Sequence, residues 1–439
     1  METIVFPKDF LNSMEDMLKE EFPLFKESFQ KNENQIGIRI NSLKLGAKEA
    51  VLSKIPNAEQ VKWCENGYYA DKSVLTGKHP YHISGLIYFQ EPSAMSTVSA
   101  LDIRPGEMVL DLCAAPGGKA TQAGEMLKNK GLLVANEIVY ERAKILSENI
   151  ERIGIENALV LSESPEKLER IFPEFFDKII MDAPCSGEGM FRKEPKALTE
   201  WSKEHSESCA IRQKHIADSA VKMLKPGGKL IYSTCTFSKC ENEDVAEYIS
   251  SIEDMELLPI SLPLSDGFDE KGYTKRVFPH REKGEGHFIA LFQKNGKSEN
   301  AEAFYKQKKF PKEFEEFARD FLKELPSGNP VLFGDRLYLM PYDMNLNKLK
   351  VLRCGLYLGE IRKGRFIPSH ALALSSLEFK NTLELPLESE EIKKYLHGET
   401  IPCEKNGWVK VTCDSFAIGL GKASGGVLKN HFPKYLRII

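Results

Sequence analysis

Short apolar runs recur between residues 85 and 294, and helical or small-residue stretches separate them. Strands that alternate with helices in this way are typical of an α/β fold with a doubly wound, Rossmann-like sheet. The strands are predicted near residues 108–112, 131–136, 158–162, 177–182, 229–234 and 287–293. In an open α/β sheet, ligands bind at the carboxyl ends of the strands. The loops that follow these runs are therefore where we expect the chemistry.

Two cysteines lie just after predicted strands. Cys185 belongs to the segment Asp182–Gly189, and Cys235 follows the apolar run 229–233. A thiol is nucleophilic enough near neutral pH to attack an unactivated carbon, so thiols at two strand ends predict covalent catalysis. An isolated free cysteine is more often inert core. We apply that interpretation to six other cysteines: Cys64, Cys209, Cys240, Cys354, Cys403 and Cys413.

A loop of small residues, Asp111–Lys119, follows the first of these strands. It matches neither the Walker A pattern nor GxGxxG. After the next strand comes Glu137, in the place of an acid that accepts hydrogen bonds from a ribose diol. The Gly117-Gly118 pair alone could be a plain structural turn, but with Glu137 the pattern indicates a nucleoside-type cofactor. The predicted cofactor contacts are Cys113, Ala114, Ala115, Pro116, Gly117, Gly118, Lys119, Glu137 and Asp182.

Several segments resemble one enzyme family in content and order. They are IYFQEPSAM, DLCAAPGGKATQ, ANEIVYERAKILSENIERIG, DKIIMDAPCSGEGMFRKEP, LKPGGKLIYSTCTFSKCENEDV and RVFPHREKGEGHFIALF. The chain is similar over residues 85–294 to the Sun/nucleolar-protein family, S-adenosylmethionine-dependent RNA cytosine-5 methyltransferases. The C-terminal extension is most similar to bacterial RsmF-type 16S rRNA enzymes. The resemblance implies methylation of carbon 5 of a cytidine in RNA, with S-adenosyl-L-methionine as cofactor and 16S rRNA or the small ribosomal subunit as partner.

The chemistry of cytosine explains why such an enzyme needs these residues. Carbon 5 is a poor nucleophile until a thiolate adds to carbon 6, and the adduct must later lose the carbon-5 proton and expel the sulfur. Asp182 can hold a proton at ring nitrogen 3, and Lys119 is expected either to position Asp182 or to favour a thiolate. Local physics does not choose between the two thiols. The resemblance implies that Cys235 attacks and that Cys185 assists release.

Some assignments stay open. Many relatives carry an aspartate after the third strand that contacts adenine; here Ser164 takes that position and Glu163 precedes it. His280 and His287 lack a partner acid at defined spacing, so a structural or RNA-contact role is favoured over a general base. A DNA cytosine-5 methyltransferase should show Phe-x-Gly-x-Gly and Glu-Asn-Val motifs, which this sequence lacks. A tRNA enzyme and a non-catalytic ribosome-assembly factor remain as alternatives.

Composition and charge limit the classes of protein to which this chain can belong. No apolar run is long enough to cross a membrane, and no secretion signal begins the chain, so we expect a cytoplasmic monomer without a membrane partner. Nine cysteines without CxxC spacing indicate neither a disulfide framework nor a metal site. The net charge of −4 divides into −9 for residues 1–295 and +5 for residues 296–439. Basic clusters in the second part could neutralise RNA phosphates. They are Arg362, Lys363 and Arg365, and Lys405, Lys410, Lys422, Lys429, Lys434 and Arg437.

Four domains are expected along the chain: an α+β RNA-contact domain (1–84), the methyltransferase domain (85–294), an α+β subdomain (300–379) and a PUA-like β-barrel RNA-binding domain (380–439). Helical spacing marks residues 7–30, and a strand over 36–41 and a helix near 46–54 follow. A polar linker is predicted at 293–300, then a helix near 311–325 and short strands at 337–339, 350–353 and 356–358.

Overall fold

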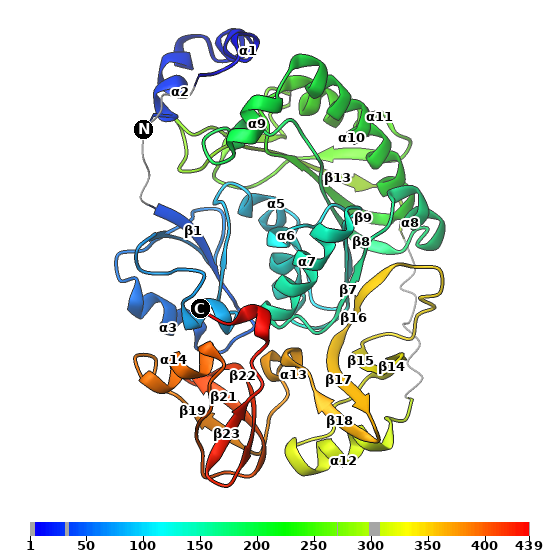
Figure 1. Cartoon of the computed structure of the whole chain (residues 1–439). Helices are drawn as coiled ribbons and strands as arrows, with labels where there is room; N and C mark the ends of the chain where they lie inside the picture. The colour runs from blue at the N-terminus through cyan, green and yellow to red at the C-terminus, as the bar shows by residue number, and fades with distance from the viewer. Residues whose placement is uncertain (1–4, 31–34, 270, 298–307, 439) are drawn as a thin grey trace.

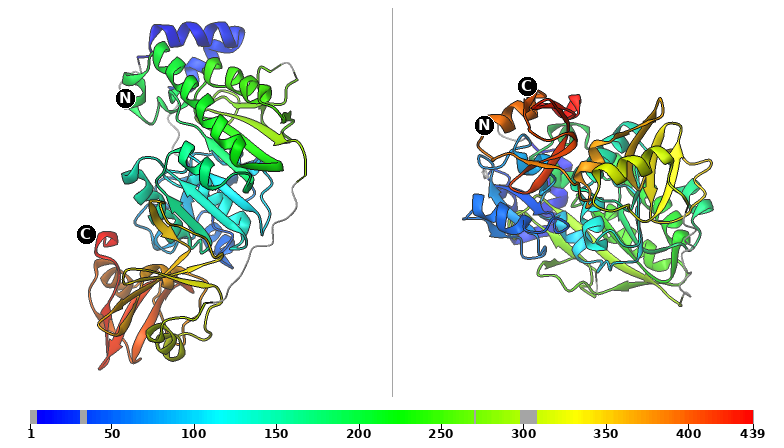
Figure 2. Two further views of the ribbon diagram at one scale, coloured as in Figure 1. Left: turned by 90° about the vertical axis from the view of Figure 1, so that its right-hand side faces the viewer. Right: turned by 90° about the horizontal axis from the view of Figure 1, so that it is seen from below.

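The computed structural model describes residues 5–30, 35–269, 271–297 and 308–438. Residues 298–300 of the predicted linker and the first residues of the predicted 300–379 subdomain lie outside these ranges. The N-terminal helices lie at one end of the molecule and the C-terminal sheets at the other, with the large central sheet between them (Figures 1 and 2). None of the helices in the described ranges is long and apolar enough to cross a membrane.

The central sheet has ten strands and confirms the predicted α/β class. Five parallel neighbours run in the order β9-β8-β5-β6-β7, and β13 (His287–Lys294) adds to β9 in the antiparallel sense. The parallel strands are β5 (Met108–Asp111), β6 (Leu132–Asn136), β7 (Ala158–Leu161), β8 (Phe176–Asp182) and β9 (Leu224–Thr234). β9 begins five residues before its predicted start because Leu224 pairs with Phe176 across a register irregularity.

Two apolar cores bury the two faces of this sheet. Along β8, Ile179 and Met181 belong to one core, whereas Ile180 between them belongs to the other. This alternation is the period of two that a strand covered on both faces requires. The helices of the central region are α5 (Met95–Ser99), α6 (Gly118–Leu127), α7 (Tyr140–Ile153), α8 (Pro165–Ile171), α9 (Pro195–Glu200), α10 (Lys203–Met223) and α11 (Glu243–Ser251). Its short elements are η2 (Glu188–Met190), η3 (Lys239–Glu241), β10 (Met255–Leu258), β11 (Ser265–Asp266) and β12 (Lys275–Val277).

The N-terminal helical segment is a bent pair rather than one helix. The first helix ends where Lys19 takes a φ of 50°, and the second carries a proline in its first turn. The pair packs phenylalanines against Phe191, Phe237 and Phe278 of the central region. The N-terminal elements are α1 (Lys8–Leu18), η1 (Lys19–Glu21), α2 (Phe22–Ser28), β1 (Gln35–Ile40), α3 (Ala47–Lys54), β2 (Glu59–Gln60), β3 (Gly67–Asp71), α4 (Pro80–Ile83) and β4 (Ile87–Phe89).

The C-terminal region forms two sheets, and one of its strands joins the central sheet instead. That strand, β16 (Val351–Cys354), pairs with β7 in the antiparallel sense, although the sequence indicated only a strand of the C-terminal subdomain. The first sheet has β14 (Asn329–Phe333), β15 (Arg336–Met340), β17 (Leu356–Arg362) and β18 (Arg365–Pro368), with α12 (Lys312–Phe321) and α13 (His370–Leu374). The second has β19 (Thr382–Glu384), β20 (Ile401–Pro402), β21 (Gly407–Cys413), β22 (Phe416–Ser424) and β23 (Val427–Asn430), with α14 (Glu390–His397) and η4 (Lys434–Leu436).

Candidate active site at the carboxyl ends of the parallel strands

The two predicted thiols lie side by side. Because β8 and β9 are parallel neighbours, with Asp182 opposite Ser233, the loops that follow them leave the sheet together. The Cys185 and Cys235 sulfur atoms are 3.3 Å apart, and both thiols are free and partly exposed. Hydrogen bonding with Cys235, followed by burial, raises the pKa of the Cys185 thiol well above its usual range. Two sulfur atoms at this separation can act on the same carbon in turn.

Asp182 is the last residue of β8, and its carboxylate is paired with a cationic side chain beside the thiols. Lys119 Nζ lies 2.9 Å from one of its carboxylate oxygens, and the Ser233 hydroxyl donates to the other at 2.7 Å. Burial alone would raise the pKa of Asp182, but the Lys119 charge and these hydrogen bonds outweigh burial and lower it. The carboxylate is therefore ionised and held in one orientation.

His287 has the acidic neighbour that its sequence surroundings did not reveal. Its Nε2 lies 4.0 Å from Asp182 and 2.9 Å from the Thr97 hydroxyl. Burial, followed by the charge of Lys119, lowers the pKa of His287 to about 3, so the ring is neutral at physiological pH. His280 lies elsewhere, against Glu21 of η1. The structure thus brings one of the two histidines to the predicted site.

The small-residue loop turns the chain from β5 into α6. Gly117 has a φ of 120°, a conformation that an L side chain rarely adopts, and α6 begins at the next residue. The Ala114 amide donates to Asn136 at the end of β6, and the Asn136 side chain donates back to Leu112. These bonds fix the loop against the neighbouring strand end. Lys119, in the first turn of α6, is thereby aimed at Asp182.

Glu137 follows β6 as predicted and is 4% exposed. One of its oxygens accepts the Val139 amide at 2.9 Å, and the other lies 3.4 Å from the Arg142 guanidinium. The carboxylate is therefore fixed beside the glycine loop, where Arg142 also donates to the Ala115 carbonyl.

Asp111, the last residue of β5, is completely buried, and neither carboxylate oxygen has a well-aligned hydrogen-bond partner among the described residues. Burial, followed by repulsion from Asp182, raises the pKa of Asp111 to about 8. Near pH 7 this acid is therefore mostly protonated, and a cationic ligand would favour its ionised form.

Glu163 is held by the C-terminal strand. Its carboxylate accepts the Lys350 amide at 2.6 Å and the Lys167 ammonium at 2.8 Å, and its backbone pairs with Asn136 on both sides. Ser164 forms the N-cap position of α8. Lys350, the residue before β16, therefore contacts the position next to Ser164, where the resemblance implies an adenine contact.

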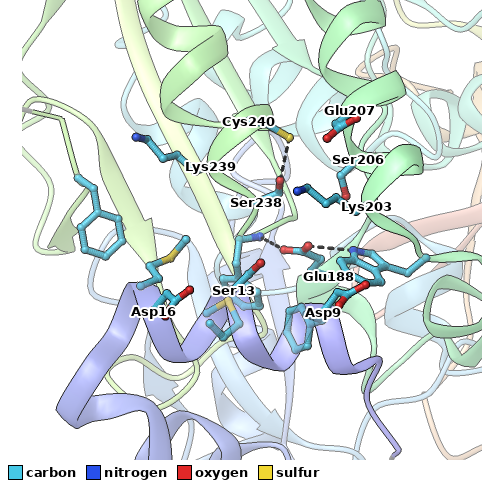
Figure 3. Close-up of a pocket in the computed structure, with 16 residues that line it drawn as sticks. Asp9, Ser13, Asp16, Glu188, Lys203, Ser206, Glu207, Ser238, Lys239 and Cys240 are labelled. Carbon is cyan, nitrogen blue, oxygen red and sulfur yellow. Dashed lines mark hydrogen bonds between the residues drawn. The ribbon is translucent and has the colours of Figure 1, made fainter.

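A pocket of about 530 Å³ lies between α1 and α10, next to the loops that follow Cys185 and Cys235 (Figure 3). Its lining includes Phe237 and Cys240 from the loop after Cys235, and Glu188 from the loop after Cys185. It includes neither thiol nor any residue of the 113–119 loop. The motifs also contain Glu188 and Glu241, for which no prediction was made from the sequence; both residues are buried, at 4% and 0% exposed.

Four family models match the chain in succession. They are the N-terminal domain of 16S rRNA methyltransferase RsmF at residues 6–92, 16S rRNA methyltransferase RsmB/F at 98–293, the first C-terminal domain of the RsmF rRNA methyltransferase at 316–375, and the RsmF PUA domain at 382–438. The ribosomal RNA small subunit methyltransferase F of Shewanella piezotolerans is 33% identical, with 98% of this chain and 97% of that protein aligned. The chain belongs to the RsmF family. Family membership makes it an RNA methyltransferase and confirms the predicted resemblance and PUA-like C-terminal domain.

Other relatives agree with this assignment. The Vibrio parahaemolyticus ribosomal RNA small subunit methyltransferase F is 34% identical over 91% of this chain and 90% of its own length. A methyltransferase homolog protein from Pyrococcus horikoshii has a solved structure similar to this one at a TM-score of 0.59. It is 29% identical over 66% of this chain and 95% of that one. NSun6 from the same organism shares the fold at a TM-score of 0.60 and 22% identity, over 66% of this chain and 99% of that one.

Proposed function

We propose that this RsmF-family protein methylates carbon 5 of a cytidine in 16S rRNA, with S-adenosyl-L-methionine as methyl donor and a cysteine adduct at carbon 6. The observation that supports this most is the pair of sulfur atoms 3.3 Å apart, next to the Lys119–Asp182 ion pair. A reaction that both makes and breaks a carbon–sulfur bond has a use for two thiols. A tRNA substrate would use the same site, and the relatives named for the small ribosomal subunit favour rRNA.

The charges around the thiols support different roles for them. The Glu241 carboxylate contributes to the raised pKa of the Cys185 thiol, after the hydrogen bond with Cys235 and burial. A thiol with a raised pKa keeps its proton. We therefore assign assistance of release to Cys185, whose S–H can give a proton, and attack on carbon 6 to Cys235, as the family resemblance implies. Asp182 is placed to hold the proton at ring nitrogen 3.

The residues around the glycine loop fit S-adenosyl-L-methionine. The 113–119 loop and Glu137 would hold its nucleoside, and Asp111 would face a cationic part of the ligand, since its buried carboxylate has no well-aligned hydrogen-bond partner in the described part of the chain. When bound, the cofactor would supply an electrophilic methyl group. Lys119 and Asp182 would fix the edge of the site between cofactor and base. We also propose the domain boundaries predicted above, with the 380–439 domain contacting RNA.

Glu137→Ala is expected to weaken S-adenosylmethionine binding at least about tenfold, because a carboxylate that accepts hydrogen bonds from a ribose diol would be lost. Isothermal calorimetry on the folded variant measures this directly. Glu141→Ala is the matched control, because Glu141 lies four residues further along the chain, in α7, and is exposed and paired with Lys144. Equal affinities for wild type and the Glu137 variant would remove Glu137 from the cofactor site.

The basic cross-strand pair Lys422 and Lys429 is expected to contact RNA phosphates. Both side chains are exposed and lie opposite each other on β22 and β23, an unfavourable arrangement for like charges unless an anion is bound. Lys410 does not belong to this surface, because it is largely buried and donates to the Leu377 carbonyl.

Replacing both Lys422 and Lys429 with glutamine should weaken RNA binding. It should also reduce the magnitude of the slope of log K against log salt concentration by about 1 to 2. Filter binding at several salt concentrations measures both. The same change at Lys128 and Lys130, exposed residues before the amino end of β6, is the control. A slope identical to wild type in the Lys422/Lys429 variant would exclude this pair from the RNA interface. A truncation after residue 295 is a poorer test, because it also removes β16 from the central sheet.

A further inference from the structure

A buried carboxylate from the second thiol loop holds the first thiol loop. Glu241, in η3 after Cys235, accepts the Ser186 amide at 3.0 Å and the Ser186 hydroxyl at 2.5 Å. The Gln213 side chain of α10 donates to the same carboxylate at 3.0 Å. Glu241 is 0% exposed, and Ser186 directly follows Cys185 in the chain. The position of Cys185 is thus set by a side chain from the loop of its partner thiol.

The reverse contact is also present. Glu188 lies three residues after Cys185. Its carboxylate accepts a hydrogen bond at 2.9 Å from the amide of Phe237, which lies two residues after Cys235 (Figure 3). Its other oxygen accepts the Trp201 indole N–H at 2.9 Å. Gly189 donates its amide to the Cys235 carbonyl at 2.9 Å, and a Cβ at that glycine would come within 2.8 Å of the same oxygen. Each loop therefore carries one carboxylate that binds the backbone of the other.

These carboxylates are costly to bury, so their presence needs a reason. Burial raises the pKa of both, that of Glu188 to about 7. A neutral amide could make similar hydrogen bonds at lower cost, but it would not bring negative charge to the thiols. After the hydrogen bond with Cys235 and burial, the charge of Glu241 also contributes to the raised pKa of the Cys185 thiol. The arrangement thus spaces the sulfur atoms and brings a negative charge to the Cys185 side.

We propose that Glu241 and Glu188 are positioning residues: each binds the backbone of the opposite thiol loop, together they set the spacing of the Cys185 and Cys235 sulfur atoms, and Glu241 also places negative charge next to the Cys185 segment. The consequence for methylation depends on the function proposed above. The consequence for the thiols themselves does not, because it can be measured on the protein alone.

The test is alkylation of each cysteine by iodoacetamide across pH, read by peptide mass spectrometry on full-length protein without RNA or cofactor. Glu241→Gln removes the charge; the amide oxygen can still accept from the Ser186 amide and from Gln213, while the new NH2 group faces the Ser186 hydroxyl, which can accept. We expect the alkylation midpoint of Cys185 to move to lower pH, because one charge that disfavours the thiolate is removed, with methylation kcat reduced and KM for RNA nearly unchanged. Glu247→Gln, exposed on the adjoining α11, is the matched control and should behave as wild type.

Two further variants separate charge from geometry. Ser186→Ala removes one hydrogen bond to Glu241 but leaves its charge, so kcat should fall while the Cys185 midpoint stays where it was. Glu188→Gln keeps an acceptor for Phe237 and should leave that midpoint unchanged. If Glu241→Gln and Glu247→Gln give the same Cys185 profile in folded protein, the proposal is wrong. If the profiles differ but no variant, nor wild type, forms 5-methylcytidine, the proposed reaction fails while the electrostatic role stands.

Discussion

Cys235→Ser is expected to abolish methylation, by about 10⁴-fold or more, and to form no covalent complex with RNA. A hydroxyl in place of the thiol cannot supply an anion near neutral pH, so carbon 6 would receive no nucleophile. Cys185→Ser should behave differently. Attack and methyl transfer should proceed, but release should stall, because the partner that lies 3.3 Å from the attacking sulfur is changed. Denaturing gels with labelled RNA and S-adenosylmethionine distinguish the two variants.

The matched control for both is Cys209→Ser, a buried cysteine of α10 outside the site, which should retain activity. The target base must leave its stack to reach either thiol, so single-stranded or loop RNA should react best. An adduct in the Cys235 variant and none in the Cys185 variant would reverse the two roles. Full activity of both variants would end the case for covalent catalysis.

Arg39→Met is expected to destabilise the protein by about 3–5 kcal/mol and to lower the thermal midpoint by about 10 °C. Arg39 lies in β1 of the N-terminal region, is 1% exposed, and pairs with Glu125 of α6 at 2.9 Å. It also donates to Thr121 at 2.6 Å and to the Gly118 carbonyl at 2.9 Å. Removing the cation would leave Glu125 buried without its charge partner. Because the same guanidinium holds the first turn of α6, cofactor affinity should fall as well.

Differential scanning fluorimetry measures the shift. Arg104→Met is the control, since its ion pair with Asp102 is exposed and worth about 1 kcal/mol or less. The double variant Arg39→Met/Glu125→Leu should recover part of the loss, as expected when the penalty is an uncompensated buried charge. A midpoint for Arg39→Met within the range of Arg104→Met would show that the guanidinium contributes little.

The central strands and the loops at their ends could be predicted because their signals are local. Apolar runs, glycine pairs and strand-end cysteines each occupy a few consecutive residues. Successive residues of β8 belong in turn to the two cores, as expected of a strand covered on both faces. The family motifs lie in those same segments. The N-terminal break at Lys19 was missed because the apolar spacing continues through it, although Phe22 and Phe25 belong to the second helix.

The C-terminal contribution to the central sheet had no local signal. The residues of β16 read as an ordinary short strand, and their pairing with β7, more than 180 residues earlier, depends on which sheet edge remains open. The same pairing brings the Lys350 amide within 2.6 Å of the Glu163 carboxylate. The C-terminal region therefore contacts the position for which the sequence left the adenine contact open.

Residue types and order along the chain sufficed to assign the family, the parallel sheet and the group of candidate site residues. They could not rank Cys185 against Cys235, because both thiols end similar strands. Folding brings Glu241 to the segment after Cys185, where it binds the Ser186 amide and hydroxyl and contributes to the raised pKa of the Cys185 thiol. Electrostatic interactions depend on distance in space and on burial. Neither can be predicted from the spacing of residues along the sequence when the interacting groups belong to different loops.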